Sequence, residues 1–137
     1  MRLTDFLIAD DVRHEIGGKF SIMGVYGDGI KINSAQAKWP IPFRIALFLR
    51  ASLDECEKIP DSFSLAISMG ENKIAEMNGT ISLKSKEAIG QLVLPLLIFP
   101  LPLPGPGLIS FVLKIMAGEE VLLDESRTID FSVDEVK

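Results

Sequence analysis

The residues best suited to chemistry lie in the stretch DDVRHEIGG, which holds the only histidine of the chain, His14. Three carboxylates accompany it in that stretch: Asp10, Asp11 and Glu15. A histidine base oriented by a carboxylate is the arrangement used by many hydrolases. Such a base works on a nucleophile, and no serine or cysteine here stands in a recognisable nucleophile motif. We therefore predict a polar turn and no catalytic residue, and keep a small hydrolase-type enzyme using His14 with its neighbouring carboxylates as the alternative.

Two further stretches could be mistaken for reactive or phosphate-binding sites. Cys56 lies in DECEK, and its acidic neighbours disfavour a reactive thiolate. The sequence YGDG at 26–29 lacks the additional glycines, or the GK[ST] and following helix, that phosphate loops need. Gly27 and Gly29 are therefore predicted to supply a turn or a bulge.

Metal binding depends on where the acidic residues meet. One histidine and one cysteine cannot supply a structural zinc site, which takes four such ligands. Calcium needs oxygen ligands only, and reversing direction at every connection would collect these carboxylates at one end of the fold: Asp10, Asp11, Glu15, Asp54, Glu55, Glu57 and Asp61. The same end would hold five cations: Arg13, Lys19, Lys58, Lys84 and Lys86. We predict a solvated mixed-charge rim without metal or cofactor, with a calcium-dependent C2-like module as a further alternative.

Composition and charge limit the class of protein. The 137 residues fit a single domain, 1–137, with no internal repeat or linker. A net charge of −5 has the wrong sign for a phosphate-binding surface, so no nucleic acid partner is expected. Cys56 cannot form an internal disulfide, and the N-terminal stretch has only a short apolar run before two aspartates. These features indicate a cytoplasmic protein.

The stretch LVLPLLIFPLPLPGPG, residues 92–107, is apolar throughout and carries five of the eight prolines. A membrane-spanning helix is excluded there because each proline removes a backbone donor. An SH3-type ligand is disfavoured because no two of these prolines have PxxP spacing. Since prolines recur at every second position from 100 to 106, we predict a rigid apolar loop at 99–107 that does not extend a sheet.

The remaining chain shows the two-residue alternation of half-buried strands. In SFSLAISM, for example, Phe63, Leu65 and Ile67 alternate with small or polar residues. Glycine-rich turn signals separate such segments. The predicted strands are 3–9, 19–26, 43–51, 62–69, 73–83, 91–98, 108–116, 119–124 and 128–134. The sequence thus predicts an all-β, antiparallel β-sandwich of about eight or nine strands, Ig-like or C2-like, with at most one or two single-turn helices at 33–39 and 52–61.

Three segments carry a resemblance to a known family. They are FLIADDVRHEIGGKFSIMGVYGDGIKI at 6–32, WPIPFRIALFLR at 39–50 and GLISFVLKIMAGEEV at 107–121. Together they resemble an uncharacterised family of small bacterial and phage-borne proteins, a domain of unknown function. The resemblance covers most of the chain and implies a β-sandwich, but it implies no reaction and transfers no catalytic residue.

Two apolar segments are expected at the end of the sandwich opposite the acidic loops. They contribute the predicted binding residues Trp39, Ile41, Phe99, Leu101 and Leu103. Side chains of this kind either cap the core or, where exposed, contact a partner. A loop held rigid by prolines loses less entropy on binding. We predict a non-enzymatic binding or assembly module of possible phage or prophage origin, which contacts a protein partner or self-associates through these residues.

Overall fold

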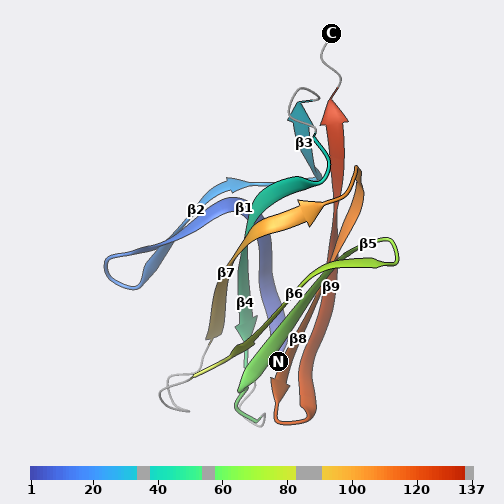
Figure 1. Cartoon of the computed structure of the whole chain (residues 1–137). Coiled ribbons are helices and arrows are strands. Elements are labelled where there is room, and N and C mark those ends of the chain that lie inside the picture. Colours follow the sequence, from blue (N-terminus) through green and yellow to red (C-terminus); the bar gives the residue numbers. More distant parts are fainter. Residues whose placement is uncertain (34–37, 54–57, 83–90, 135–137) are drawn as a thin grey trace.

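Nine strands in two sheets make up the computed structural model, which describes residues 1–33, 38–53, 58–82 and 91–134. The sheets have four and five strands and give the molecule a sandwich-like form (Figure 1). The strands are β1 Arg2–Glu15, β2 Lys19–Val25, β3 Gly29–Asn33, β4 Ile41–Ser52, β5 Ser62–Met69, β6 Asn72–Thr80, β7 Gln91–Leu103, β8 Gly107–Ala117 and β9 Glu120–Asp134. The predicted all-β class is confirmed.

Helix is absent from the described residues, so none of them forms a helix that could cross a membrane. The single-turn helices considered at 33–39 and 52–61 involve residues 34–37 and 54–57, which lie outside the described part of the chain.

The order of strands is β2-β1-β4-β7 in the four-stranded sheet and β3-β9-β8-β5-β6 in the five-stranded sheet. Hairpins join β1 to β2, β5 to β6 and β8 to β9, at the glycine-containing turns that the sequence predicts. One pairing differs from the expected antiparallel arrangement, because β3 runs parallel to β9. The sandwich is therefore mixed rather than purely antiparallel.

The core lies between the sheets and is built from alternating side chains, as predicted. On β8, Ile109, Phe111 and Leu113 are all fully buried. On β4, every second residue from Ile45 to Leu49 also enters the core. Burying each such side chain stabilises the fold by roughly 1.5–3 kcal/mol relative to its exposed state.

Two predicted boundaries were wrong near the chain's C-terminal strand. The expected break between 124 and 128 does not occur, because Ser126 and Thr128 pair with β8 within the continuous strand β9. Their polarity reflects a solvent-facing position, and no glycine or proline is present there to interrupt the ladder. Strand β3 was missed altogether, since five residues give little periodicity and their partner lies about a hundred positions further along the chain.

The prediction of a loop at 99–107 was also wrong. Strand β7 continues to Leu103 and pairs with β4 as far as the Ile41–Leu103 pair. The connection to β8 is reduced to Pro104, Gly105 and Pro106. A register shift between Phe43 and Ile45 of β4 places an additional residue in β7 at this point.

Prolines are tolerated in β7 because it is an edge strand. Pro95 faces Phe48, and Pro102 faces Pro42. Along a strand, the backbone N–H groups of successive residues point alternately toward one neighbouring strand and toward the other side. Phe48 and Pro42 are six positions apart, an even number, so the two prolines opposite them occupy equivalent positions in this alternation. In the phase whose amides point away from β4, a missing N–H removes no hydrogen bond. The edge position thus resolves the conflict between proline and strand.

Candidate interaction surface

The five predicted binding residues fall into two groups. Leu101 and Leu103 are completely buried and belong to the core. Ile41 is half-buried beside Leu103, and the Trp39 ring lies 6.0 Å from the ring of Phe131. Leu101, Leu103 and Ile41 therefore close this end of the sandwich, whereas Trp39 remains 36% exposed beside Phe131.

Phe99 lies on the other side of the same strand. It stands at the register shift of β7, where the chain carries its additional residue, and its side chain is 64% exposed. Its neighbours Ile98 and Leu101 point into the core. Phe99 therefore belongs to the outer face of the four-stranded sheet and not to the cap of the core.

That outer face has an apolar centre formed by three adjacent strands. One row across the sheet consists of Leu7, Phe48 and Pro95, and the next consists of Ala9, Ala46 and Leu97. None of these six residues belongs to the core cluster between the sheets, although Ala9, Ala46 and Phe48 are buried. Leu97 is 50% exposed although it lies in this apolar centre. We call the set Leu7, Ala9, Ala46, Phe48, Pro95, Leu97 and Phe99 the apolar sheet face.

Ion pairs border the apolar sheet face at both ends. At one end, near the start of β1, Arg50 Nε lies 2.6 Å from Asp5 Oδ2. At the other end, further along β1, Arg44 Nη2 lies 3.2 Å from Asp11 Oδ1. The pKa of Asp11 is lowered by the hydrogen bond that Arg13 Nε donates to it and by the nearby charge of Arg44, against an opposing effect of burial. The border is thus charged, locally neutralised and close to solvent.

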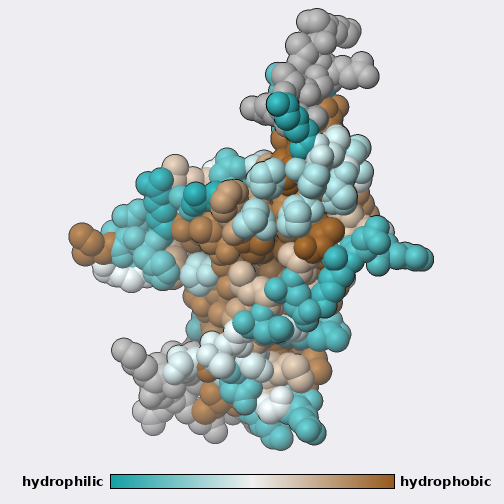
Figure 2. All heavy atoms as spheres, in the orientation of Figure 1, coloured by the Kyte–Doolittle hydropathy of each residue, from teal (hydrophilic) through white to brown (hydrophobic). Residues whose placement is uncertain are grey.

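A hairpin formed by residues 10–25 of β1 and β2 lies next to this face. We refer to this hairpin as the arm. The Phe20 ring of the arm contacts the Phe48 ring at 5.5 Å in an edge-to-face arrangement. The His14 ring contacts Phe20 from the opposite strand, with 4.5 Å between the ring centroids. Figure 2 shows hydrophobic side chains gathered below the arm, on the side where β7 and β4 lie. The arm covers Phe48 and leaves Leu97 half open.

The sequence does contain a signal for the missed residue Leu97. From 92 to 99 every residue is apolar, so both faces of the strand are apolar. Such a strand is typical of a central position in a sheet, covered on both sides. Because β7 is an edge strand with only its inner face in the core, Leu97 on its outer face remains 50% exposed.

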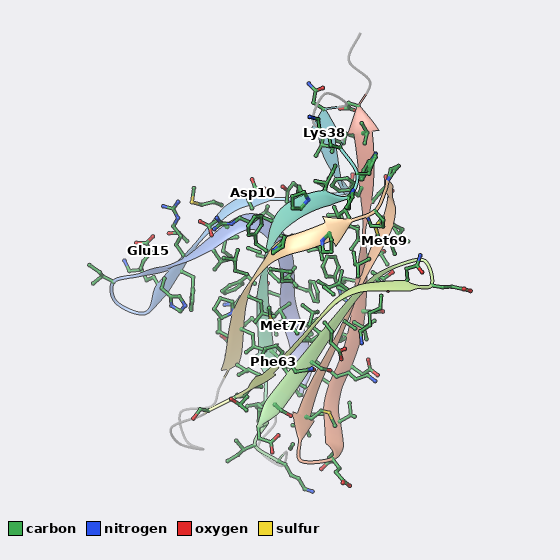
Figure 3. The ribbon with its side chains drawn as sticks, in the orientation of Figure 1. Asp10, Glu15, Lys38, Phe63, Met69 and Met77 are labelled. Atoms are coloured by element: carbon green, nitrogen blue, oxygen red, sulfur yellow. The ribbon has the colours of Figure 1, made fainter. Side chains whose placement is uncertain are left out.

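The hydrolase alternative depends on His14 meeting its carboxylates, and they are spread along the arm. Asp10 lies at the base of the arm and Glu15 near its tip (Figure 3). The His14 ring packs against the Phe20 ring. A hollow lies between the β5–β6 turn and the β7–β8 connection, away from His14 and these carboxylates. It is lined by Met69, Gly70, Asn72 and residues 104–108.

Asp10 has a structural task at the base of the arm. Its carboxylate accepts a hydrogen bond from the Tyr26 hydroxyl, and the Tyr26 amide donates to the carbonyl of Ile8 at 2.8 Å. Burial and the adjacent Asp10 carboxylate raise the pKa of Tyr26 well above its usual range. Gly24 has φ +65° and no side chain, and an added Cβ would lie 2.3 Å from Asp10 Oδ2. This cluster fixes the point at which the arm leaves the sheet.

The predicted collection of carboxylates at one end was wrong, and the missed strand explains the error. Arg2 pairs with Ser52, so β1 begins at the end where β4 finishes and runs away from it. The prediction from sequence did not include β3 and therefore omitted one reversal of chain direction. With that reversal included, the arm lies at the opposite end of the fold from the connection at 52–61. Asp61 remains at the latter end, where its side chain accepts from the Gly118 amide at 2.9 Å.

Within the described residues, no group of three or more histidine, cysteine, aspartate or glutamate side chains is placed to hold a metal ion. Asp54, Glu55 and Glu57 of the predicted rim, together with Cys56, lie outside the described residues.

Comparison with known proteins gives no family assignment: no protein-family model and no curated protein matches the chain.

Proposed function

We propose that the protein is a non-enzymatic binding or assembly module that contacts a protein partner through the apolar sheet face. The observation that carries this proposal is the exposure of two large apolar side chains on one edge strand, Leu97 at 50% and Phe99 at 64%. They adjoin Leu7 and Pro95, which are partly exposed, while Ala9, Ala46 and Phe48 of the same face are buried. Exposed apolar side chains with a polar border are typical of protein interaction sites.

The composition of the face indicates the chemistry of its partner. An apolar or aromatic anchor would cover Leu97 and Phe99, while polar groups would meet the ion pairs of Arg44 and Arg50 at the border. Burying the two exposed side chains would contribute up to about 1.5–3 kcal/mol each, before ordering costs. The prolines of β7 restrict its backbone in advance, which reduces those costs.

The resemblance to small bacterial and phage-borne proteins supports a phage or prophage origin and an Ig-like or C2-like strand arrangement. The same origin is compatible with an assembly role in the cytoplasm, where a single unpaired cysteine is ordinary. A hydrolase-type or calcium-dependent function is not proposed, because no observation on the described residues favours either.

The test is quantitative capture from a lysate of the native host with three immobilised forms of the protein. The surface variant combines Leu97→Ser with Phe99→Ser. The matched control combines Leu108→Ser with Val121→Ser, two side chains that are 52% and 49% exposed on the five-stranded sheet. A protein captured by the wild type should bind the control equally and bind the surface variant at least tenfold less, since about 1.4 kcal/mol corresponds to a factor of ten.

Both variants must retain the thermal melt of the wild type, which the exposure of all four side chains predicts. Equal capture by the surface variant and the control would show that the apolar sheet face is not the contact surface.

A further inference from the structure

The arm, residues 10–25, is a two-stranded hairpin that extends beyond the rest of its sheet (Figure 1). Pairing between β1 and β4 ends at Ala9, which faces Ala46. Within the described residues β2 pairs only with β1. A hairpin of two strands alone is marginally stable in water. The position of the arm therefore depends on the side chains that it sets against the four-stranded sheet.

The arm is bent back over the outer face of that sheet. Phe20 faces His14 within the arm. Phe48 faces Leu7 on the body of the sheet. Along a straight strand, the chain from Leu7 to His14 would span about 23 Å, at about 3.3 Å per residue. The rings of Phe20 and Phe48 are nevertheless only 5.5 Å apart, so the arm folds back toward Phe48.

The bend has its pivot at the base of the arm, where the ladder is interrupted. Asp10 and Gly24 stand opposite one another there but do not form a ladder pair, and pairing resumes at the next position on either side. Gly24 has φ +65°, a backbone conformation that other residues rarely adopt. The Tyr26 hydroxyl donates to the Asp10 carboxylate and fixes the near side of the interruption. Such short irregular positions are where an element turns relative to its neighbours.

Beyond the base, two ring or polar contacts between described residues tie the arm to the sheet. One is the Phe20 ring on Phe48, and the other is the ion pair of Asp11 with Arg44. The Arg44 side chain is 53% exposed, so the ion pair stabilises this position little. Phe20 is therefore the main anchor of the arm, and Phe48 beneath it is only 8% exposed.

We propose that the arm is an autoinhibitory strap, in which Phe20 occupies the place on Phe48 that an aromatic side chain of the partner takes when the arm lifts. This inference rests on the function proposed above and names the chemistry of the partner's anchor. With Phe20 in place, the large exposed side chains of the face are Leu97 and Phe99. With Phe20 displaced, Phe48 joins them, and the exposed apolar surface becomes continuous across β4 and β7.

The geometry of the existing contact indicates an aromatic anchor. The Phe20 and Phe48 rings meet edge to face, with 61° between their planes. Rings favour this arrangement because the positive edge of one meets the negative face of the other. A ring supplied by a partner reproduces that contact on Phe48, whereas an aliphatic side chain reproduces only the burial. Aromatic residues are also enriched among the anchors of protein interfaces.

The first test measures access to the sheet beneath the arm and needs no partner. Ala46 is 1% exposed and lies between the base of the arm and Phe48. Ala46→Cys in a Cys56→Ser background therefore places a thiol under the arm, and its alkylation by iodoacetamide should be slow. Adding Phe20→Ala should accelerate alkylation about tenfold. Met23→Ala is the matched control, because Met23 lies on the same strand but is 45% exposed, and it should leave the rate unchanged.

The second test uses the aromatic probe 8-anilinonaphthalene-1-sulfonate, whose fluorescence rises in apolar sites. Phe20→Ala should bind the probe roughly threefold more tightly than the wild type or more, and adding Leu97→Ser should remove that gain. Hydrogen exchange separates lifting of the arm from general unfolding. In Phe20→Ala the amides of the arm should exchange faster, while those of the core strand β8 should keep their wild-type rates.

Equal alkylation with Phe20→Ala and with Met23→Ala would overturn the strap and leave the proposed function in force, as would faster exchange throughout β8. A partner captured through Leu97 and Phe99 should bind Phe20→Ala more tightly than the wild type. Weaker capture by Phe20→Ala would show that the arm belongs to the contact surface, refuting competition. Capture that ignores Leu97 and Phe99, with alkylation and probe binding that respond to Phe20, would support the strap and contradict the proposed function alone.

Discussion

Truncation of Leu101 tests directly whether the proline-rich strand belongs to the core. Leu101 is fully buried, and replacing a buried leucine by alanine removes its transfer free energy and leaves a cavity. The expected cost is about 2–5 kcal/mol of unfolding free energy. At roughly 3 °C per kcal/mol for a chain of this size, Leu101→Ala should lower the melting temperature by about 6–15 °C.

Phe99→Ala is the matched control, because it lies on the same strand but points away from the core with 64% of its side chain exposed. Its cost should stay below about 1 kcal/mol, or about 3 °C. Thermal melts by circular dichroism and urea titrations at equilibrium measure both variants, and association should be unchanged in Leu101→Ala. Melting of Leu101→Ala together with the wild type, or a larger loss in Phe99→Ala, would refute the assignment of the two faces of β7.

Three further predictions concern the base of the arm. Tyr26 is the only tyrosine, so an absorbance titration reports it alone, and it should ionise well above its ordinary pKa of 10.0. Asp10→Asn should bring this ionisation back toward the ordinary value, and an unshifted midpoint in the wild type would contradict the burial and hydrogen bond described. Because the folded-state pKa is the higher one, the stabilisation from Tyr26 is complete below pH 10.0 and is lost as pH rises toward the folded value, which urea titrations below and above that pH can measure. Gly24→Ala should cost at least about 1–2 kcal/mol, because φ is +65° and the new Cβ would displace the Asp10 carboxylate, whereas Gly70→Ala, at φ +60° but with open space around it, should show the backbone cost alone.

The periodic strands could be predicted from sequence because each needs only its own two faces. Strand β5 has the predicted bounds, 62–69, and the alternating positions of β8 enter the core as expected. The position of a strand within a sheet is a different matter, since it depends on partners elsewhere in the chain. The apolar run of β7 signals that both faces of the strand are apolar, but not whether a further strand follows it in the sheet, so its edge position and the half-exposed state of Leu97 could not be predicted.

The same limit applied to the predicted binding residues, whose burial could not be predicted from sequence. The prediction that the two apolar segments carrying these residues meet at one end of the sandwich is confirmed, because Ile41 pairs with Leu103. Both residues lie at the ends of their strands, next to a connection. Which of these side chains enter the core depends on the register shift beside Phe43, and a shift of one residue exchanges the two faces of a strand. Omission of the short strand β3 then reversed the predicted position of the arm.

The parallel pairing of β3 with β9 has a consequence for biosynthesis. Residues 29–33 leave the ribosome early, but their partner, residues 130–134, is among the last described residues to be made. Until then Ile30, which becomes buried, has no strand to pair with and no Phe131 beside it. Closing such a distant contact is slow, and the unfinished sheet exposes an unpaired edge in the meantime. We therefore expect the nascent chain to carry an unpaired sheet edge, and with it a risk of aggregation, until residues 130–134 are made.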